Sequence, residues 1–373
     1  MLIKKAVIII TQRELEIIEI IKGDPFVSQQ EIADLLNITR SSVAVHITNL
    51  IKKGIIRGRG YVIDERDHVS VIGGANMDIV GYPFTKLRKS DSNPGEVNLS
   101  VGGVGRNIAE NLARLGNHTK MFTVVGEDIH GDKIITESES AGMDMSHVRK
   151  VNEYGTGTYL AILNENNDMD VAIAAMDIFK KLDRKYIDEN RQIISKSQII
   201  VFDTNLEEDV FQYSVDLFKD NILFLDTVSH TKALRAKEVI GLFHTIKPNK
   251  MEAEALSGIE IESREDMDRA AAHFHDEGVK NVFITLGENG VYYSDGTTQG
   301  IMKARKIIPK NATGAGDAFQ AALVHAELNH MEIEEKVKFA MAASILAMSS
   351  YSTINPEMSE SNIMKTINDM EEK

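Results

Sequence analysis

The sequence predicts an α/β protein, with helices packed on a layered sheet of mostly parallel strands, preceded by a small separate helical domain. Two observations lead to this prediction. From Val69 onward, short apolar segments alternate with longer segments of helical periodicity, which is typical of parallel strands joined by helices. Residues 1–66 show a different pattern, in which helix signals follow one another and a short charged segment, 64–67, ends the unit.

Two helix starts can be recognised in the first 66 residues. Thr11 and Ser28 each precede a glutamate by three residues, which is the signature of a capping box. The first helix then repeats Leu15, Ile18 and Ile21 at helical spacing. In the second helix we expect three apolar side chains to face inward, namely Ile32, Leu35 and Leu36.

A third helix at about 40–53 and two short strands at 55–57 and 61–63 complete the pattern of a helix-turn-helix with a wing. Five basic residues and no acidic residue lie between Thr39 and Gly60, although the whole chain has a net charge of −14. This segment resembles the winged helix-turn-helix domains of bacterial regulators, which implies DNA as a partner. The candidates for DNA contact are Arg40, Ser41, Ser42, His46, Asn49, Arg57 and Arg59. The alternative is a dimerisation module whose charges are only solvated.

The larger domain, residues 67–373, contains six expected strands and eight expected helices. The strands are 69–73, 120–125, 198–203, 221–226, 244–248 and 282–286. The helices are 106–115, 132–140, 184–195, 206–218, 250–256, 264–277, 316–328 and 333–349. In parallel sheets of this kind, ligands bind beyond the carboxyl ends of the strands, so functional residues are expected there.

The segment Asn-Ala-Thr-Gly-Ala-Gly-Asp at 311–317 runs directly into an apolar helix. Glycines leave backbone N–H groups free to turn toward a ligand, and a helix N-terminus adds unpaired donors and partial positive charge, so a phosphoryl group fits there. Asp317 lies at the end of this cradle, where a carboxylate can take a proton from an attacking nucleophile. The segment predicts a small-molecule kinase; the alternative is an ordinary turn that caps a helix.

Composition excludes several other classes. The chain has no cysteine, which removes disulfides, thiolate zinc sites and cysteine nucleophiles. The apolar run 6–10 is too short for a signal-peptide core and no segment approaches membrane-spanning length, so we expect a cytoplasmic protein with no membrane partner. The motifs Gly-x-x-x-x-Gly-Lys, His-Arg-Asp and Asp-Phe-Gly are missing, so neither a P-loop enzyme nor a protein kinase is expected.

Four ordered motifs show that residues 67–373 resemble the ribokinase-like (PfkB) family of carbohydrate and nucleoside kinases. They are Gly-Gly-Val-Gly-Arg-Asn-Ile-Ala at 102–109, Lys-Pro-Asn-Lys-Met-Glu at 247–252, Thr-Leu-Gly-Glu-Asn-Gly at 285–290 and Gly-Ala-Gly-Asp at 314–317. The resemblance implies a three-layer α/β/α domain with a small β lid at about 79–101 and 156–173. Because lid strands often pair between subunits in this family, it also implies a homodimer.

Within the family, the segments 74–78, 91–95, 102–116 and 226–229 resemble pseudouridine kinases, including relatives with an N-terminal helix-turn-helix. This resemblance implies ATP-dependent phosphorylation of the 5′-hydroxyl of pseudouridine, with a possible link to transcriptional regulation. Two alternatives stay open. The first is a kinase for another nucleoside or sugar, and the second is a nucleoside-sensing transcription regulator with a kinase-like domain.

The same resemblance implies roles for individual residues. The expected substrate-binding residues are Asn76, Asp78, Gly102, Gly103 and Asn107. The expected catalytic residues are Gly314, Ala315, Gly316 and Asp317. ATP is expected to contact Asn249, Thr285, Gly287 and Gly290, and Mg²⁺ to be held by Asn249 and Glu252 largely through water. An alternative for Asn249 and Glu252 is a helix-start cap with a surface acid.

One position departs from the family pattern. The late signature often begins with Asp-Thr, whereas this chain has Asn311 at its first position. Family sites for K⁺ lie close to this segment, so the sequence leaves K⁺ open as a further cofactor.

Overall fold

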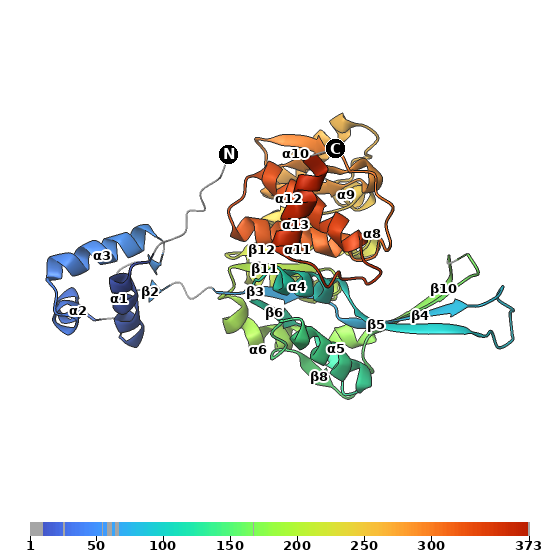
Figure 1. Ribbon diagram of the computed structural model, residues 1–373, viewed down its shortest axis with the longest axis horizontal. Helices are drawn as coiled ribbons and strands as arrows, with labels where there is room; N and C mark the ends of the chain where they lie inside the picture. Colours follow the sequence, from blue (N-terminus) through green and yellow to red (C-terminus); the bar gives the residue numbers. More distant parts are fainter. Residues whose placement is uncertain are drawn as a thin grey trace. The chain divides into compact units, whose positions relative to one another are not determined.

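The computed structural model describes residues 10–24, 27–53, 55–57, 62–63, 67–166 and 168–371. The chain divides into two compact units, Met1–Arg66 and Asp67–Lys373, each of which has its own apolar core (Figure 1). In the described part of the chain, none of the helices has the length and hydropathy that a membrane span requires.

Three helices and a two-stranded antiparallel wing make up the described residues of the first unit. Its elements are α1 (Gln12–Gly23), α2 (Gln29–Leu36), α3 (Arg40–Lys52), β1 (Ile56–Arg57) and β2 (Val62–Ile63). Both predicted capping boxes are present, with Thr11 accepting from the N–H of Glu14 and Ser28 accepting from that of Glu31. The expected strand residue Tyr61, the wing tip at 58–60 and most of the charged segment at 64–67 lie outside the described residues.

One prediction about α2 is wrong. Leu35, which was expected to face inward, is 68% exposed. The helix buries Ile32 and Ala33 instead, with Leu36 partly buried beside them, so the buried face of α2 is rotated toward Ala33 and away from Leu35. Leu35 lies outside that face. In α3, by contrast, Val43, Ile47 and Leu50 form the buried stripe that their spacing predicts.

The second unit is built on an eight-stranded sheet. Its strands are β3 (Val69–Ile72), β6 (Thr119–Phe122), β11 (Ile199–Asp203), β12 (Ile222–Asp226), β13 (Thr245–Ile246), β14 (Asn281–Thr285), β15 (Val291–Ser294) and β16 (Gln299–Met302). Their spatial order is β16-β15-β14-β13-β12-β11-β3-β6. The six strands from β14 to β6 in that order are parallel, as predicted, whereas β15 and β16 add an antiparallel edge.

Helices cover both faces of this sheet, which gives the predicted three layers. The larger ones are α4 (Val104–Arg114), α5 (Ile129–Ser140), α6 (Arg184–Ile194), α7 (Glu208–Leu217), α9 (Lys250–Ser257), α10 (Arg264–Glu277), α11 (Ala315–Leu328), α12 (Ile333–Met348) and α13 (Glu360–Glu371). One core cluster joins the sheet to α4, α11, α12 and α13. A second cluster joins the other face to α6, α7, α9 and α10. Short helical turns, η1 (Asp177–Lys181), α8 (His230–Ala233), η2 (Leu234–Leu242) and η3 (Gly287–Asn289), connect these elements.

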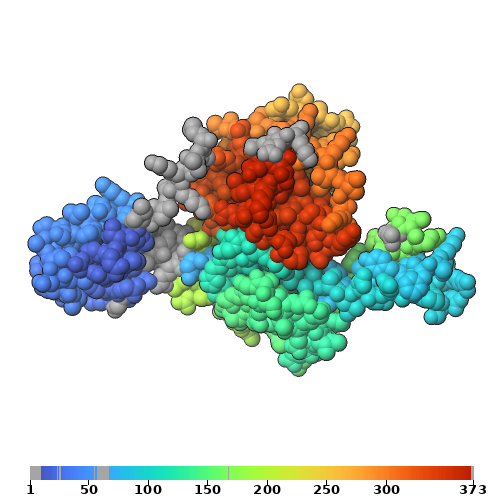
Figure 2. Space-filling view, viewed as in Figure 1, coloured from blue at the N-terminus to red at the C-terminus, as the bar shows by residue number. Residues whose placement is uncertain are grey.

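A separate four-stranded sheet extends away from the three-layer body (Figures 1 and 2). Its strands are β4 (Asn76–Pro83), β5 (Gly95–Gly102), β9 (Thr158–Leu163) and β10 (Met169–Ala175), in the order β10-β9-β4-β5. Strands β9 and β10 pair antiparallel within the segment where the β lid was expected. A further short pair, β7 (Val124–Gly126) and β8 (Arg149–Val151), means that the single strand expected at 120–125 is divided between two sheets. We call β4, β5, β9 and β10 the lid sheet.

Candidate active site

Polar residues gather where the parallel strands of the body end. Asp203 is the last residue of β11, Asp226 is the last residue of β12, and Lys247 follows β13 directly. Because the carboxyl ends of parallel strands meet at one edge of a sheet, these side chains share that edge with the starts of α4, α9 and α11. All three are buried, at 8% exposure or less, so their charges must be satisfied by one another or by a ligand.

Asp203 fixes the backbone at the root of the lid sheet. Its Oδ2 accepts hydrogen bonds from the N–H groups of Gly74 and Gly105, each at 2.8 Å. Gly74 lies between β3 and the first lid strand, and Gly105 lies in the first turn of α4. One buried carboxylate therefore ties the lid strand β4 and the helix α4 to the end of β11.

The expected sugar-binding residues form one cluster. Asn76 donates from Nδ2 to Oδ1 of Asp78 at 2.6 Å. A Cβ on Gly102 would lie 2.2 Å from Oδ2 of Asp78, and one on Gly103 would lie 2.5 Å from the carbonyl oxygen of Gly74. Both glycines are therefore required for close approach, and Gly103 also has a φ of 100°. Burial raises the pKa of Asp78, although Asn76 and the Arg106 charge partly oppose this effect.

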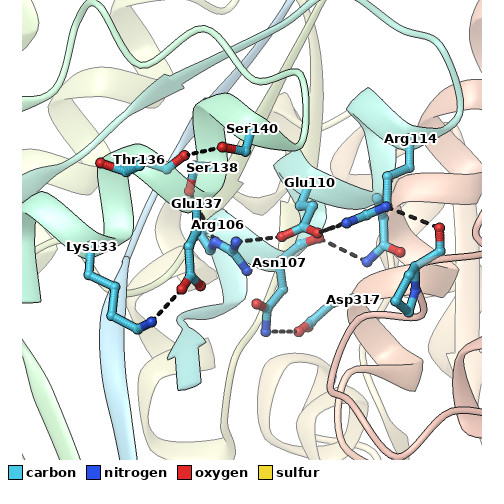
Figure 3. Close-up of polar contacts among 12 residues, drawn as sticks. Arg106, Asn107, Glu110, Arg114, Lys133, Thr136, Glu137, Ser138, Ser140 and Asp317 are labelled. Carbon is cyan, nitrogen blue, oxygen red and sulfur yellow. Dashed lines mark hydrogen bonds and ion pairs between the residues drawn. The ribbon is translucent and has the colours of Figure 1, made fainter. Parts of the chain in front are cut away.

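Asn107 and Asp317, which are 210 positions apart in the sequence, are brought into direct contact (Figure 3). Nδ2 of Asn107 donates to Oδ2 of Asp317 at 2.8 Å. Oδ1 of Asn107 is buried and has no hydrogen-bond partner among the described residues, which leaves an acceptor for a ligand hydroxyl. Burial, helped by the like charge of Asp226, raises the pKa of Asp317 to about 7.

A buried ion network lies behind Asn107 on α4 (Figure 3). The guanidinium of Arg106 pairs with Glu110 and donates from Nε to Oγ of Ser138 at 3.2 Å. Glu110 also pairs with Arg114 at 2.7 Å, and Arg114 donates to the carbonyl oxygen of Pro356 at 3.1 Å. Because each member is held by a partner of opposite charge or by a carbonyl, this network fixes the position of α4 and with it that of Asn107.

Lys247 places a buried positive charge beside the predicted anion cradle. Its Nζ lies 3.2 Å from Oδ2 of Asp226, and a Cβ on Gly316 would lie 3.6 Å from the same Nζ. Although burial lowers the pKa of the Lys247 ammonium, the charges of Asp226 and Asp317 outweigh it and raise that pKa. The lysine is therefore charged, next to the backbone of the cradle.

The cradle itself is an open helix N-terminus. Gly314 is the N-cap residue of α11, with a φ of 83°, and offers no side chain to cap the helix. The N–H of Ala315 bonds back to the carbonyl oxygen of Ala312 at 3.4 Å. The N–H groups of Gly316 and Asp317 lie in the first turn, where helix geometry offers them no backbone acceptor. Two donors are thus available to an anion.

The N-terminus of α9, by contrast, is capped by side chains. Asn249 accepts from the N–H of Glu252 at 2.9 Å, and Oε2 of Glu252 accepts from the N–H of Asn249 at 2.8 Å. The same Oε2 also accepts from the hydroxyl of Thr227 at 2.6 Å. The helix-start cap that the sequence offered as an alternative role for Asn249 and Glu252 is therefore present. Glu252 is buried, however, and is not a surface acid.

A pocket of about 590 Å³ lies beside the start of α9. It brings together three of the four residues predicted to contact ATP, namely Asn249, Thr285 and Gly287. The remaining lining residues are Lys250, Met251, Met267, Leu286, Asn289, Ile301 and Lys303. An apolar lining with two lysines suits a flat heterocycle that carries phosphate groups. Gly290 does not line the pocket; it has a φ of 102° and lies in the turn between β14 and β15, where a Cβ would lie 2.0 Å from the carbonyl oxygen of Met302.

The donor set for Mg²⁺ is sparse. Among the residues that the structure describes, no group of three or more histidine, aspartate or glutamate side chains is placed to hold a metal ion. Asn249 and Glu252 already use oxygens in the α9 cap. Mg²⁺ usually keeps several waters and binds through one or two carboxylates together with substrate phosphates, and this donor set fits that mode.

Most of the predicted DNA-contact residues lie on the open surface of α3. Arg40, Ser41, Ser42 and Asn49 are exposed, whereas His46 is half-buried with its Nδ1 inside. Ser42 also contacts Oγ1 of the N-cap Thr39 at 2.9 Å. Arg57 belongs to β1, and Arg59 lies outside the described residues.

Three residues of the site carried no predicted role: Asp203, Asp226 and Lys247. A signal for them was present, because each is a charged residue at the carboxyl end of a short apolar segment.

The chain belongs to the pfkB family of carbohydrate kinases, which matches residues 66–360. Residues 10–57 match winged helix-turn-helix DNA-binding domains. The protein is therefore an ATP-dependent kinase of the ribokinase-like fold, acting on sugars or nucleosides, with an N-terminal winged helix-turn-helix.

Two curated relatives from Escherichia coli K12 and one solved structure are similar to it. The pseudouridine kinase is 36% identical over 308 residues, covering 82% of this chain and 98% of the relative. The uncharacterized sugar kinase YeiI is 35% identical over 357 residues, covering 95% of this chain and 98% of the relative. A Clostridium perfringens structure assigned to the sugar kinases has 38% identity and a TM-score of 0.75, covering 82% of this chain and 96% of its own.

Proposed function

We propose that this kinase transfers the γ-phosphoryl group of ATP to the 5′-hydroxyl of pseudouridine. The observation that carries the proposal is the Asp317 carboxylate, whose pKa is raised to about 7, which contacts Asn107 and which lies in the first turn of a helix with an open N-terminus. A general base works best when its pKa lies near the working pH. The similarity to a pseudouridine kinase at 36% identity supports this acceptor over other nucleosides.

The sugar would be oriented by Asp78 and Asn107. A carboxylate accepts hydrogen bonds from both hydroxyls of a vicinal diol, and Oδ2 of Asp78 lies against Gly102, where the missing side chain leaves room. The buried and unpartnered Oδ1 of Asn107 offers a further acceptor. These contacts would hold the 5′-hydroxyl close to Asp317, because Asn107 touches that carboxylate directly.

Asp317 would then take the proton of the 5′-hydroxyl as its oxygen attacks phosphorus. The N–H groups of Gly316 and Asp317 and the ammonium of Lys247 would stabilise the charge on the phosphoryl oxygens. These groups are preorganised, because Lys247 is held by Asp226 and Gly314 fixes the helix start. A sensor domain has no need of such a base.

The pocket beside α9 would hold the nucleotide base of ATP, with Lys250 and Lys303 near its phosphates. Mg²⁺ would be held through water by Glu252 and Asn249, where it would neutralise phosphate charge. Glu252 is suited to this because it is fixed by Thr227 and by its own cap.

Turnover of a substrate panel tests the proposal. We expect ATP consumption with pseudouridine to exceed that with uridine, inosine or ribose, and Asp317→Asn to lose about 10²-fold or more in kcat. Equal turnover of ribose would overturn the choice of acceptor, whereas undiminished turnover by the variant would overturn the role of Asp317. A coupled assay that records ADP formation supplies both comparisons.

A homodimer through the lid sheet is part of this proposal. Strand register places Val97, Leu99, Ile79, Leu160 and Ile173 on one face, opposite the face that carries Asp78. Four side chains of that face, Val97, Leu99, Val171 and Ile173, are each about half exposed or more. A second copy would cover this apolar face. Light scattering that finds a monomer at micromolar concentration would contradict it.

Specific binding of duplex DNA by α3 is the second proposed function. It is supported by the winged helix-turn-helix match and by the exposed Arg40, Ser41 and Asn49 on a helix without acidic residues. A dimer would suit a palindromic site. Fluorescence anisotropy with a selected duplex tests it: we expect Arg40→Ala to weaken binding and to reduce its salt dependence, and no binding by the wild type would refute it.

A further inference from the structure

Residues 310–313, at the start of the sequence motif that leads into α11, are hydrogen-bonded to the loop that follows α12. Nδ2 of Asn311 donates to the carbonyl oxygen of Tyr351 at 3.1 Å, and Oδ1 of Asn311 accepts from the N–H of Thr313 at 2.9 Å. The N–H of Lys310 donates to the carbonyl oxygen of Met348 at 2.9 Å. The two loops are therefore held together by the Asn311 amide and by the main chain.

A positive charge is built into the same junction. Nζ of Lys310 lies 5.2 Å from the centroid of the Tyr351 ring. This distance is within the range of a cation–π contact, so the ammonium is attracted to the ring whose main chain accepts from Asn311. Lys310 thus adds a cation–π contact between the two loops.

The position of this loop controls the anion cradle. A Cβ on Gly314 would lie 2.2 Å from the carbonyl oxygen of Thr353, so the loop and the N-cap of α11 are in direct contact. Any shift of Thr353 relative to Gly314 would move the N–H groups of Gly316 and Asp317. A factor that fixes the loop is therefore a factor that fixes the catalytic geometry.

These residues do not fit a bound K⁺ at this junction. K⁺ is held by oxygen ligands such as main-chain carbonyls, and the family signature often provides an aspartate at position 311. Here the residue is an asparagine whose N–H₂ group faces the carbonyl of Tyr351. That carbonyl already accepts a hydrogen bond, and an N–H donor in its path repels a cation.

We propose that the Asn311 amide takes the place of a monovalent cation, so that this kinase works without K⁺. A carboxylate at position 311 would set two acceptors against each other, since it is negatively charged and the Tyr351 carbonyl oxygen carries a partial negative charge, and a cation would be needed between them. The amide is itself the donor. The inference rests on kinase activity and is independent of which nucleoside is the acceptor.

The first test compares salts on the full-length enzyme. Turnover of the acceptor that the substrate panel identifies is measured in KCl, NaCl and choline chloride at equal ionic strength, so that screening is constant. We expect the three rates to agree within about twofold and the melting temperature to be the same in all three. A rate in KCl that is about tenfold or more above that in choline chloride would overturn the proposal.

The second test introduces the carboxylate. We expect Asn311→Asp to lose about tenfold in turnover in choline chloride and to regain it in KCl, because the lost hydrogen bond is replaced by an ion bridge. Independently of activity, KCl is expected to raise the melting temperature of Asn311→Asp, and choline chloride is not. If KCl changes neither the turnover nor the melting temperature of Asn311→Asp relative to choline chloride, the proposal is overturned.

A matched control separates this effect from a general loss of stability. Nδ2 of Asn362 donates to the carbonyl oxygen of Glu357 at 2.8 Å at an exposed site near the start of α13. Asn362→Asp loses the same kind of bond and gains the same charge away from the cradle. We expect it to show no response to K⁺, and an equal response in both variants would overturn the proposal. If Asn311→Asp does not fold, the comparison of wild-type turnover in KCl, NaCl and choline chloride still decides whether the kinase needs K⁺.

Discussion

Two helices begin at the same edge of the sheet, and their N-termini are opposite in kind. In α9 the N-cap is Asn249 and the third residue is Glu252, and each side chain bonds to the other's backbone. In α11 the N-cap is Gly314, which has no side chain, and the third residue is Asp317, which bonds to Asn107 instead. Both helices therefore carry an acid at the third position and use it differently.

This difference shows how one helix start becomes structural and the other becomes reactive. A capped start has satisfied its own donors and keeps its carboxylate as a fixed part of the scaffold. An uncapped start keeps free N–H groups for an anion and leaves the carboxylate to a partner from another segment. The residue at the N-cap decides between the two outcomes.

Replacing Gly314 is expected to have the largest effect on this contrast. In Gly314→Ala the new Cβ would lie 2.2 Å from the carbonyl oxygen of Thr353 at a φ of 83°, so the cradle must move. We expect kcat to fall by about a hundredfold. Gly258→Ala is the matched control, because Gly258 also has a positive φ, at 71°, but nothing lies within 4 Å of its Cβ position. Equal losses of kcat in both variants would contradict the role of the cradle.

The pH dependence of the reaction probes the third residue of α11. Because the pKa of Asp317 is raised to about 7, kcat/KM is expected to fall about tenfold per pH unit below pH 7 and to level off above it. The raised pKa also means that the folded state binds a proton more tightly than the unfolded state, so stability falls as pH rises from about 4 to 7.

The same group allows a check by unfolding. We expect Asp317→Asn to have a higher free energy of unfolding than the wild type at pH 8, by up to about 4 kcal/mol, and a similar one at pH 4. An acid limb of kcat/KM near pH 4, or a variant less stable than the wild type at pH 8, would contradict the assignment of this pKa to Asp317.

The third residue of α9 allows its two roles to be separated. Glu252→Gln keeps an oxygen that can accept from the N–H of Asn249 but removes the negative charge. We expect the concentration of Mg²⁺ needed for half-maximal rate to rise about tenfold, with little change in melting temperature. Titration of the rate with Mg²⁺ at saturating ATP measures this. If the Mg²⁺ dependence of the rate is unchanged, Glu252 caps α9 but does not help to hold Mg²⁺.

The smallest effect is expected at the N-cap of α9. Asn249→Ala removes the side chain that accepts from the N–H of Glu252, and the loss of such a cap costs about 1 kcal/mol of stability. Chemical denaturation of the full chain measures the change in the free energy of unfolding. Ser263→Ala removes the corresponding cap of α10, away from the site, and is expected to cost a similar amount while leaving kcat unchanged.

Much of the fold could be predicted from the sequence. The six parallel strands and the helices between them follow from local periodicity, and the capping boxes at Thr11 and Ser28 follow from residue type and spacing. The antiparallel strands β15 and β16 were missed, because they are only four residues each and because β15 is buried on both faces, so its residues do not alternate between apolar and polar. Helix α13 was missed because it lies beyond the last family motif.

The site could be predicted only in part. Gly102, Gly103 and Asp317 stand in motifs whose spacing indicates their chemistry, and the structure brings their segments together. The charges of Asp226 and Lys247 were not predicted, because their role depends on pairing across two strands that are adjacent only in the fold. The exposure of Leu35 also depends on which face of α2 meets α3, which periodicity over eight residues does not resolve.

The alternation along the lid strands has a consequence for mutation. Asp78 and Ile79 are neighbours in β4 and point to opposite faces, one toward the sugar-binding cluster and one into the apolar surface. A slip of one residue would exchange the two faces over the whole strand, since side chains alternate with a period of two. Any insertion or deletion within β4 would therefore alter the proposed substrate recognition and the proposed self-association together, and neither of these proposed properties could change independently of the other through changes in strand length.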